Sequence, residues 1–506
     1  MRQLSGHNAG LLYADTRLAN ANVSLLHIFD QATAAGGVVR FKSILAHIDQ
    51  RLSGSSLFRQ RLLRVPLALD HPYWVDDDQF DLEYHVRHIA LPRPGDWRQF
   101  CIQAARVHAR PLDLDRPLWE AYVIEGLDSF IDLPAGSFAL LLKTHLAAVG
   151  LQQLAQISTL LLDDSASPPP PGPPAPWFAD SAPGTLALVR RGLVQSGTAP
   201  LRLVRPLARM ATRIVPAAAA LASEMLLRPH PLPPTRFNSA VSPHRVFETR
   251  RFAEAEMARV CRLVPGATVD DAVLAICGGA LRAYLLAEGE LPEGASLTAL
   301  QPAVQQRAGP PGDAGADPAP LWRTVRLGTD IADPLRRLAF VREQADASPD
   351  ALARRLRSTA LAEAGAQASA ALLSMTRRLR GCVNARLGPR TPPAHCTVTP
   401  VPAPAQAQFL CGARMSYYSA ILPISDGLGL AFAITRHDGR VVISPTACRE
   451  LVPDPEALAL CLRDSFQQYL ALADAGEKRA RRRAGDSKSR PRKQAAKTGS
   501  KNMPRE

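Results

Sequence analysis

The chain has 506 residues, of which 46% are hydrophobic and 6% aromatic; this mixture excludes a disordered chain and predicts a folded protein of two or three domains. The formal net charge of +14 is uneven, because from residue 476 to the end 12 Lys or Arg stand against 3 Asp or Glu. That tail therefore carries +9 of the charge, and the body is only mildly basic.

Eight cysteines are scattered with no CxxC pair and no metal-ligand spacing, which predicts reduced thiols and no metal site. The first eight residues lack the apolar core of a signal peptide. There is also no run of about 18 apolar residues that could span a bilayer. We therefore expect a cytoplasmic protein.

The first 164 residues alternate apolar runs with helical periodicity. Residues 24–29 are typical of a strand, whereas residues 41–51 and 96–109 have the spacing of helices. This alternation predicts an α/β layered half over residues 1–164.

One histidine stands out near the end of this half. The apolar run at residues 138–142 predicts a buried strand, and residues 151–162 have helical spacing, so His145 falls where a strand ends and a loop begins. Catalytic groups often occupy such places, although a single histidine there is more commonly structural.

Two unusual segments follow. Residues 165–180 are a proline-rich linker that favours an extended conformation. Residues 181–241 form a basic segment with helical spacing, in which residues 186–228 hold seven arginines and one acid, Glu224. Such a segment suits an anionic membrane surface, but helices packed on the body with their arginines in water fit it equally well.

The alternation of strand-like and helical patterns returns over residues 242–475 and predicts a second α/β half. Helical spacing covers residues 267–286 and 450–472, and a further helix is expected at 333–355, with Asp333 as its N-cap. Residues 429–435 and 440–444 read as paired strands. The basic tail, residues 476–506, is expected to be disordered and either to contact lipid headgroups or nucleic acid, or only to solubilise the chain.

Short distinctive stretches follow one another along the chain in a characteristic order. They are LSGHNAGLLY (4–13), FRQRL (58–62), HPYWVDD (71–77), FDLEYHVR (80–87), PLDLDRPLWE (111–120), FNSAVSPHR (237–245), ATVDDAVLA (267–275), SDGLGL (425–430) and CRELVPDP (448–455). Together they resemble the bacterial wax ester synthase/diacylglycerol acyltransferase family over roughly residues 1–473.

This resemblance implies a fold and a reaction. The fold would be α/β, with two halves similar to CoA-dependent acyltransferases of the chloramphenicol acetyltransferase type, enclosing a solvent tunnel and joined by the proline-rich crossover. The reaction would move an acyl group from acyl-CoA to diacylglycerol or a long-chain alcohol, making triacylglycerol or wax ester without a cofactor. The expected partners are these substrates and a membrane or lipid-droplet surface; nucleic acid is not expected.

The resemblance also assigns site residues. The family's Pro-Leu-Trp motif is matched by Pro117, Leu118 and Trp119, and its usual Asn-Asp pair by Asp270 and Asp271. In the family's His-His-x-x-x-Asp-Gly motif, the second His is the general base that takes the proton of the acceptor hydroxyl, and such a base contributes about 10² to 10⁴ in rate.

Two alignments of this motif remain open. Without gaps, Lys143 keeps its usual place, His145 takes the first His, Leu146 the second and Gly150 the Asp. Leucine cannot accept a proton, so ordinary catalysis would be lost. Shifting by one residue makes His145 the base and Gly150 the Gly, but requires a deletion before the motif and an insertion after it.

Other family positions differ as well. The usual Ser-Asn-Val-Pro-Gly-Pro turn has become residues 397–402, with Val398 and Val401 in place of Asn and Gly, and the common N-terminal Asp is Asn8. No other set of residues in the sequence suggests a substitute base. Two functions fit: an acyltransferase of this family impaired by its degenerate motif, or a catalytically inactive paralogue that binds acyl lipid or associates with a membrane.

Overall fold

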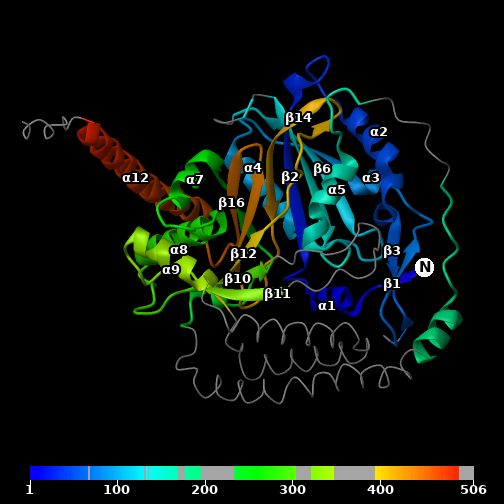
Figure 1. The fold of residues 1–506 in the computed structure, drawn as a ribbon. Coiled ribbons are helices and arrows are strands. Elements are labelled where there is room, and N and C mark those ends of the chain that lie inside the picture. Colours follow the sequence, from blue (N-terminus) through cyan, green and yellow to red (C-terminus); the bar gives the residue numbers. More distant parts are fainter. Residues whose placement is uncertain are drawn as a thin grey trace, which may run out of the picture.

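The structure, a computed structural model, describes residues 1–66, 69–129, 133–134, 136–168, 177–194, 233–303, 321–346 and 394–488. It consists of two large mixed sheets, a small third sheet and the helices that cover them (Figure 1). No helix within these residues is long and apolar enough to cross a membrane.

The first large sheet has six strands in the order β13-β14-β2-β7-β6-β5. Their bounds are β2 Asn22–Asp30, β5 Val86–Ala90, β6 Trp119–Leu127, β7 Ser137–His145, β13 Phe409–Leu410 and β14 Ala413–Ile421. Alternate residues of β2 point to opposite faces. Val23 and Leu25 pack in the core with helices α2 (Phe41–Arg51) and α5 (Leu154–Leu161), whereas Leu26 packs with α4 (Trp97–Ala109).

The second large sheet has seven strands in the order β11-β10-β12-β15-β16-β8, with β9 also paired to β16. Its strands are β8 Arg245–Phe247, β9 Arg250–Ala253, β10 Thr298–Ala303, β11 Leu321–Arg326, β12 Cys396–Pro400, β15 Leu430–His437 and β16 Arg440–Cys448. The helices packed on it are α7 Glu254–Cys261, α8 Val269–Ala287, α9 Pro334–Asp346 and α12 Pro455–Lys488. Together they enclose a second hydrophobic core.

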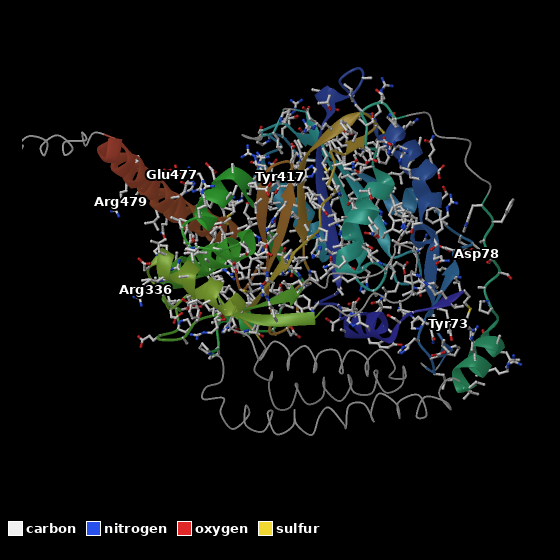
Figure 2. The ribbon with its side chains drawn as sticks, in the orientation of Figure 1. Tyr73, Asp78, Arg336, Tyr417, Glu477 and Arg479 are labelled. Atoms are coloured by element: carbon white, nitrogen blue, oxygen red, sulfur yellow. The ribbon has the colours of Figure 1, made fainter. Side chains whose placement is uncertain are left out.

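The small sheet has the order β1-β4-β3. Its strands are β1 Arg2–Gln3, β3 Gln60–Leu63 and β4 Tyr73–Asp76. The remaining short elements of the chain are α1 Gly6–Ala14, η1 Gln31–Thr33, η2 Leu52–Gly54, η3 Ser56–Phe58, α3 Leu82–His85, η5 Leu151–Gln153 and η6 Arg236–Asn238. A helix over residues 185–194 packs on this region, because Leu188 is buried against Val65 and Tyr73. Tyr73 lies near this helix in Figure 2.

The second half contributes a strand to the first sheet. Although β14 lies within the second half in sequence, it pairs with β2 in the first sheet and also contacts β15 and β16. Ser419 of β14 hydrogen-bonds Ser444 of β16 at 2.6 Å, and Tyr417 donates to Thr249 at 2.8 Å. Tyr417 is labelled at this boundary, which we call the seam, in Figure 2. Nothing in the sequence indicates this pairing.

Most predicted elements are confirmed, with small shifts at their ends. Helix α2 has the predicted bounds, and the β15–β16 pair forms around a turn at Asp438, whose φ is 48°. Asp333 caps α9, accepting the backbone N–H of Arg336 at 2.7 Å.

The prediction of a disordered tail is wrong for residues 476–488, which continue α12 as helix. Ion pairs stabilise the start of this extension, because Arg259 of α7 contacts both Asp474 and Glu477. The end of the tail, half of the proline-rich linker, residues 195–232 and the predicted end of the helix at 333–355 lie outside the described residues.

Candidate active site

His145 is the last residue of β7, as the sequence predicted. β7 lies between β2 and β6, and all nine of its residues are buried. The backbone N–H of His145 donates to Leu118 O at 3.2 Å, and that of Leu146 donates to Ala21 O at 3.0 Å. The strand end is therefore fixed on both sides.

The imidazole of His145 is enclosed. The residue is 0% exposed, and Nε2 lies 2.9 Å from Asp15 Oδ2. Nδ1 accepts the backbone N–H of Ala147 at 3.0 Å. An accepting Nδ1 places the ring proton on Nε2, which donates to the carboxylate, so neither nitrogen has a lone pair available for a substrate hydroxyl.

Asp15, which binds Nε2 of His145, is itself held by the backbone. It follows α1, and its Oδ1 accepts the backbone N–H of Ala21 at 2.9 Å. The His145–Asp15 pair therefore ties the loop between α1 and β2 to the end of β7. These contacts are those of a positioning histidine.

The residues after His145 form a tight turn. The N–H groups of Ala148 and Val149 both point to His145 O, at 2.8 and 3.2 Å. Leu146 is half-buried against the first hydrophobic core. Gly150 has φ −64° and ψ 156°, a conformation open to any residue, so the backbone does not require a glycine there.

Lys143 lies two residues before His145 on the same face of β7, and it is also buried. Its Nζ donates to Arg110 O at 2.5 Å and lies 3.4 Å from Glu120 Oε2. Burial lowers the pKa of Lys143, while the charge of Glu120 opposes that shift. These partners link Lys143 to β6 and to the end of α4, not to open solvent.

The Pro-Leu-Trp residues lie directly beside His145. Leu118 O accepts both the His145 N–H and the Thr144 hydroxyl, the latter at 3.1 Å. Trp119 donates its indole N–H to Phe58 O at 3.0 Å. The stretch beginning at Pro117 thus supports the strand end.

Asp270 and Asp271 lie at the start of α8. Asp271 forms a capping box with Thr268, accepting its hydroxyl at 2.7 Å. Asp270 forms an ion pair with Arg436 at 2.7 Å on the surface. Neither carboxylate contacts His145.

One polar cluster at the seam was missed by the sequence reasoning. Ser242 and His244 meet Glu450, which lies just after β16, although about two hundred residues separate them. Both stretches carry the family resemblance, but nothing in the sequence pairs them. Within the described residues, no group of three or more His, Cys, Asp or Glu side chains is placed to hold a metal ion.

Comparisons with known proteins extend over most of the chain. Residues 4–273 match the wax ester synthase/diacylglycerol acyltransferase catalytic domain, and residues 322–469 match the WS/DGAT C-terminal domain. A putative diacylglycerol O-acyltransferase of Mycobacterium tuberculosis is 30% identical over 497 residues, covering 94% of this chain and 98% of that protein. Another from that species is 27% identical over 489 residues, covering 94% and 91%.

Solved structures share the fold. The wax ester synthase/diacylglycerol acyltransferase from Marinobacter aquaeolei VT8 superposes with a TM-score of 0.64 at 22% identity, covering 93% of this chain and 100% of that one. The first condensation domain of the calcium-dependent antibiotic synthetase gives 0.51 at 15% identity, covering 94% and 96%. The predicted two-part α/β fold of the CoA-dependent acyltransferase type is confirmed.

Proposed function

Because the chain belongs to the wax ester synthase/diacylglycerol acyltransferase family, we propose that it takes an acyl group from acyl-CoA and passes it slowly to diacylglycerol or a long-chain alcohol. The names of its relatives support diacylglycerol as an acceptor. The reaction needs no cofactor, since the thioester of acyl-CoA supplies the activated acyl group.

The observation that carries the slow rate is the closed environment of His145. Its Nε2 donates to Asp15 and its Nδ1 accepts from Ala147, so the ring has no free lone pair. These contacts support the alignment without gaps, in which His145 is the first histidine of the motif and Leu146 stands in the place of the base. Loss of a positioned general base typically costs about 10² to 10⁴ in rate.

The closed environment of His145 is also compatible with a second function. A family member without its base can keep the fold and bind acyl lipid with no turnover. The two functions differ in one measurable property, which is whether the unaltered protein forms any ester.

The test is acyl transfer from radiolabelled long-chain acyl-CoA to diacylglycerol or a long-chain alcohol, with His145→Gln beside the unaltered chain. Glutamine preserves an N–H donor for Asp15, so the fold should persist. We expect slow ester formation that changes only a few-fold in the variant. A loss of about 10² or more would make His145 the base and contradict the proposal. Acyl-CoA binding without ester formation would favour the inactive paralogue.

We further propose peripheral attachment to a membrane or lipid-droplet surface through the basic segment. In the helix at residues 185–194 of this segment, Leu186 is 83% and Leu193 58% exposed beside the exposed Arg190 and Arg191. Apolar side chains flanked by arginines suit an anionic lipid surface.

Co-sedimentation with vesicles containing anionic lipid tests this attachment. Replacing Arg190 and Arg191 with Gln should weaken binding, since each basic residue near such a surface contributes about 1 kcal/mol. Binding by the variant equal to that of the unaltered chain would contradict the role of this helix.

A further inference from the structure

A second histidine–carboxylate pair lies at the seam. His244 Nδ1 is 2.9 Å from Glu450 Oε1. The other carboxylate oxygen accepts the Ser242 hydroxyl at 2.5 Å and the Cys448 thiol at 2.9 Å. Three side chains therefore converge on one carboxylate and fix its orientation.

Glu450 is charged at neutral pH. Desolvation alone would raise its pKa, but hydrogen bonds from Cys448, Ser242 and His244 outweigh it and lower the pKa to about 2. An anionic carboxylate cannot donate, so the proton between the two groups belongs to Nδ1 of His244.

When His244 is neutral, this tautomer leaves Nε2 with its lone pair. The side chain is 64% exposed, and among the described residues no donor or acceptor is recorded against Nε2. A carboxylate that holds Nδ1–H and an open Nε2 is the arrangement of a general base, because the carboxylate also stabilises the imidazolium that forms.

A chain of contacts links the pair to His145. The next residue, Arg245, spans the seam, with one guanidinium nitrogen donating to Ser242 O and the other to Leu18 O. Leu18 belongs to the loop between α1 and β2 that also carries Asp15, the partner of His145. One loop therefore contacts both histidine sites.

The two regions also share one hydrophobic core. Val241 and Cys448 belong to the core that contains Val149 and Leu154, on either side of Gly150. One continuous core therefore connects the polar cluster with the motif turn.

Other described histidines are less available. Several have ring nitrogens bound to the protein interior, namely His27, His85, His108 and His395. His88 forms a similar half-exposed pair with Glu125 at 3.0 Å. However, β5, which carries His88, is the edge strand at the end of the sheet opposite β13 and β14.

We propose that His244 is the general base for acyl transfer in this chain and that Glu450 orients it; the proposal rests on the proposed function. As the oxygen of the acceptor alcohol attacks the thioester carbonyl carbon, its proton moves to Nε2. The C–S bond of the tetrahedral intermediate then breaks, and the imidazolium returns the proton to the sulfur of CoA. Ester and free CoA thiol leave, and His244 is neutral again.

The kinetic test compares His244→Gln and Glu450→Gln with His88→Gln, a matched control from the other exposed histidine–carboxylate pair. We expect His244→Gln to lower kcat about 10²-fold with little change in KM for acyl-CoA. Glu450→Gln should cause a smaller loss, and His88→Gln none. Unchanged kcat in His244→Gln, with ester still formed, overturns the proposal and leaves the proposed function intact.

A second readout does not depend on turnover. Diethyl pyrocarbonate modifies accessible imidazoles, and mass spectrometry of the digested protein locates each adduct. In the folded protein we expect modification of His244 and His88 but not of His145, and long-chain acyl-CoA should protect His244 alone. Acyl-CoA that binds but protects neither residue overturns the proposal, whereas absence of both acyl-CoA binding and turnover refutes the proposed function itself.

Discussion

The end of β7 and the seam each present a histidine paired with a carboxylate, yet the two pairs differ in access. His145 has a side chain 1% exposed, and both of its ring nitrogens are occupied. His244 is 64% exposed and uses only Nδ1. The carboxylate is common to both, so the availability of the second nitrogen decides whether the imidazole can act as a base.

Restoring the family motif should have the largest effect. The variant Leu146→His, Gly150→Asp, Leu151→Gly places a second histidine immediately after the closed one. Because the backbone at Gly150 is extended, an aspartate fits it. Because His244 already supplies about 10² of the 10² to 10⁴ that a positioned base contributes, we expect acyl transfer to rise by up to about 10².

A matched control for the restored motif replaces Leu146 with Gln in the same background, which adds polarity without a base. The restored enzyme should also lose its dependence on His244. If its rate equals that of the glutamine control, Leu146 does not occupy the place of the base.

Acid should destabilise the protein through its closed histidines. Burial lowers the pKa of His27 from 6.5 to about 4, although its bond to Leu140 O opposes the shift. Burial likewise lowers the pKa of His108 to about 3, and the charge of Lys143 adds to this. Between pH 6.5 and 4 the unfolded chain therefore binds protons that the folded chain excludes, and stability falls as pH falls.

Urea unfolding at a series of pH values measures this loss. The neutral state of His27 accounts for at most about 3 kcal/mol of the lost unfolding free energy. His27→Gln should therefore reduce the slope of unfolding free energy against pH on the acid side, which we call the acid limb. His244→Gln is the control, since an exposed ring loses little hydration on folding. An unchanged acid limb in His27→Gln would show that His27 is protonated in the folded protein.

Removing each carboxylate should lower the unfolding free energy by a smaller amount, and that amount should differ between the two pairs. Asp15→Ala leaves the Nε2–H of His145 buried without a partner, which costs about 1–3 kcal/mol of unfolding free energy. Glu450→Ala should cost less, since water replaces the carboxylate at an exposed ring. Equal losses in the two variants would mean that the pairs do not differ in burial as described.

The sequence predicted the local parts of this structure. The helix at residues 41–51, the β15–β16 pair and the position of His145 at a strand end all follow from short-range periodicity and turn residues. The extension of α12 was missed because Glu477 is held by Arg259, a contact between helices far apart in the chain.

Long-range pairing limited the prediction of the site. The sequence left two positions open for His145 in the motif, and the contacts with Asp15 and Ala147, on which the proposed alignment rests, could not be predicted from it. His244 and Glu450 are 206 residues apart and meet because β8 pairs with β16. Neither periodicity nor spacing within one segment can indicate such a contact.

A crystal structure with a thioether analogue of long-chain acyl-CoA would locate the reacting carbon directly. We predict that this carbon lies against the side chain of Leu146, with Nε2 of His244 facing the site of the acceptor oxygen and His145 still bound to Asp15 and to the Ala147 N–H. A ring nitrogen of His145 turned toward the reacting carbon, within about 3 Å of the site of the acceptor oxygen, would contradict this view and restore His145 as the base.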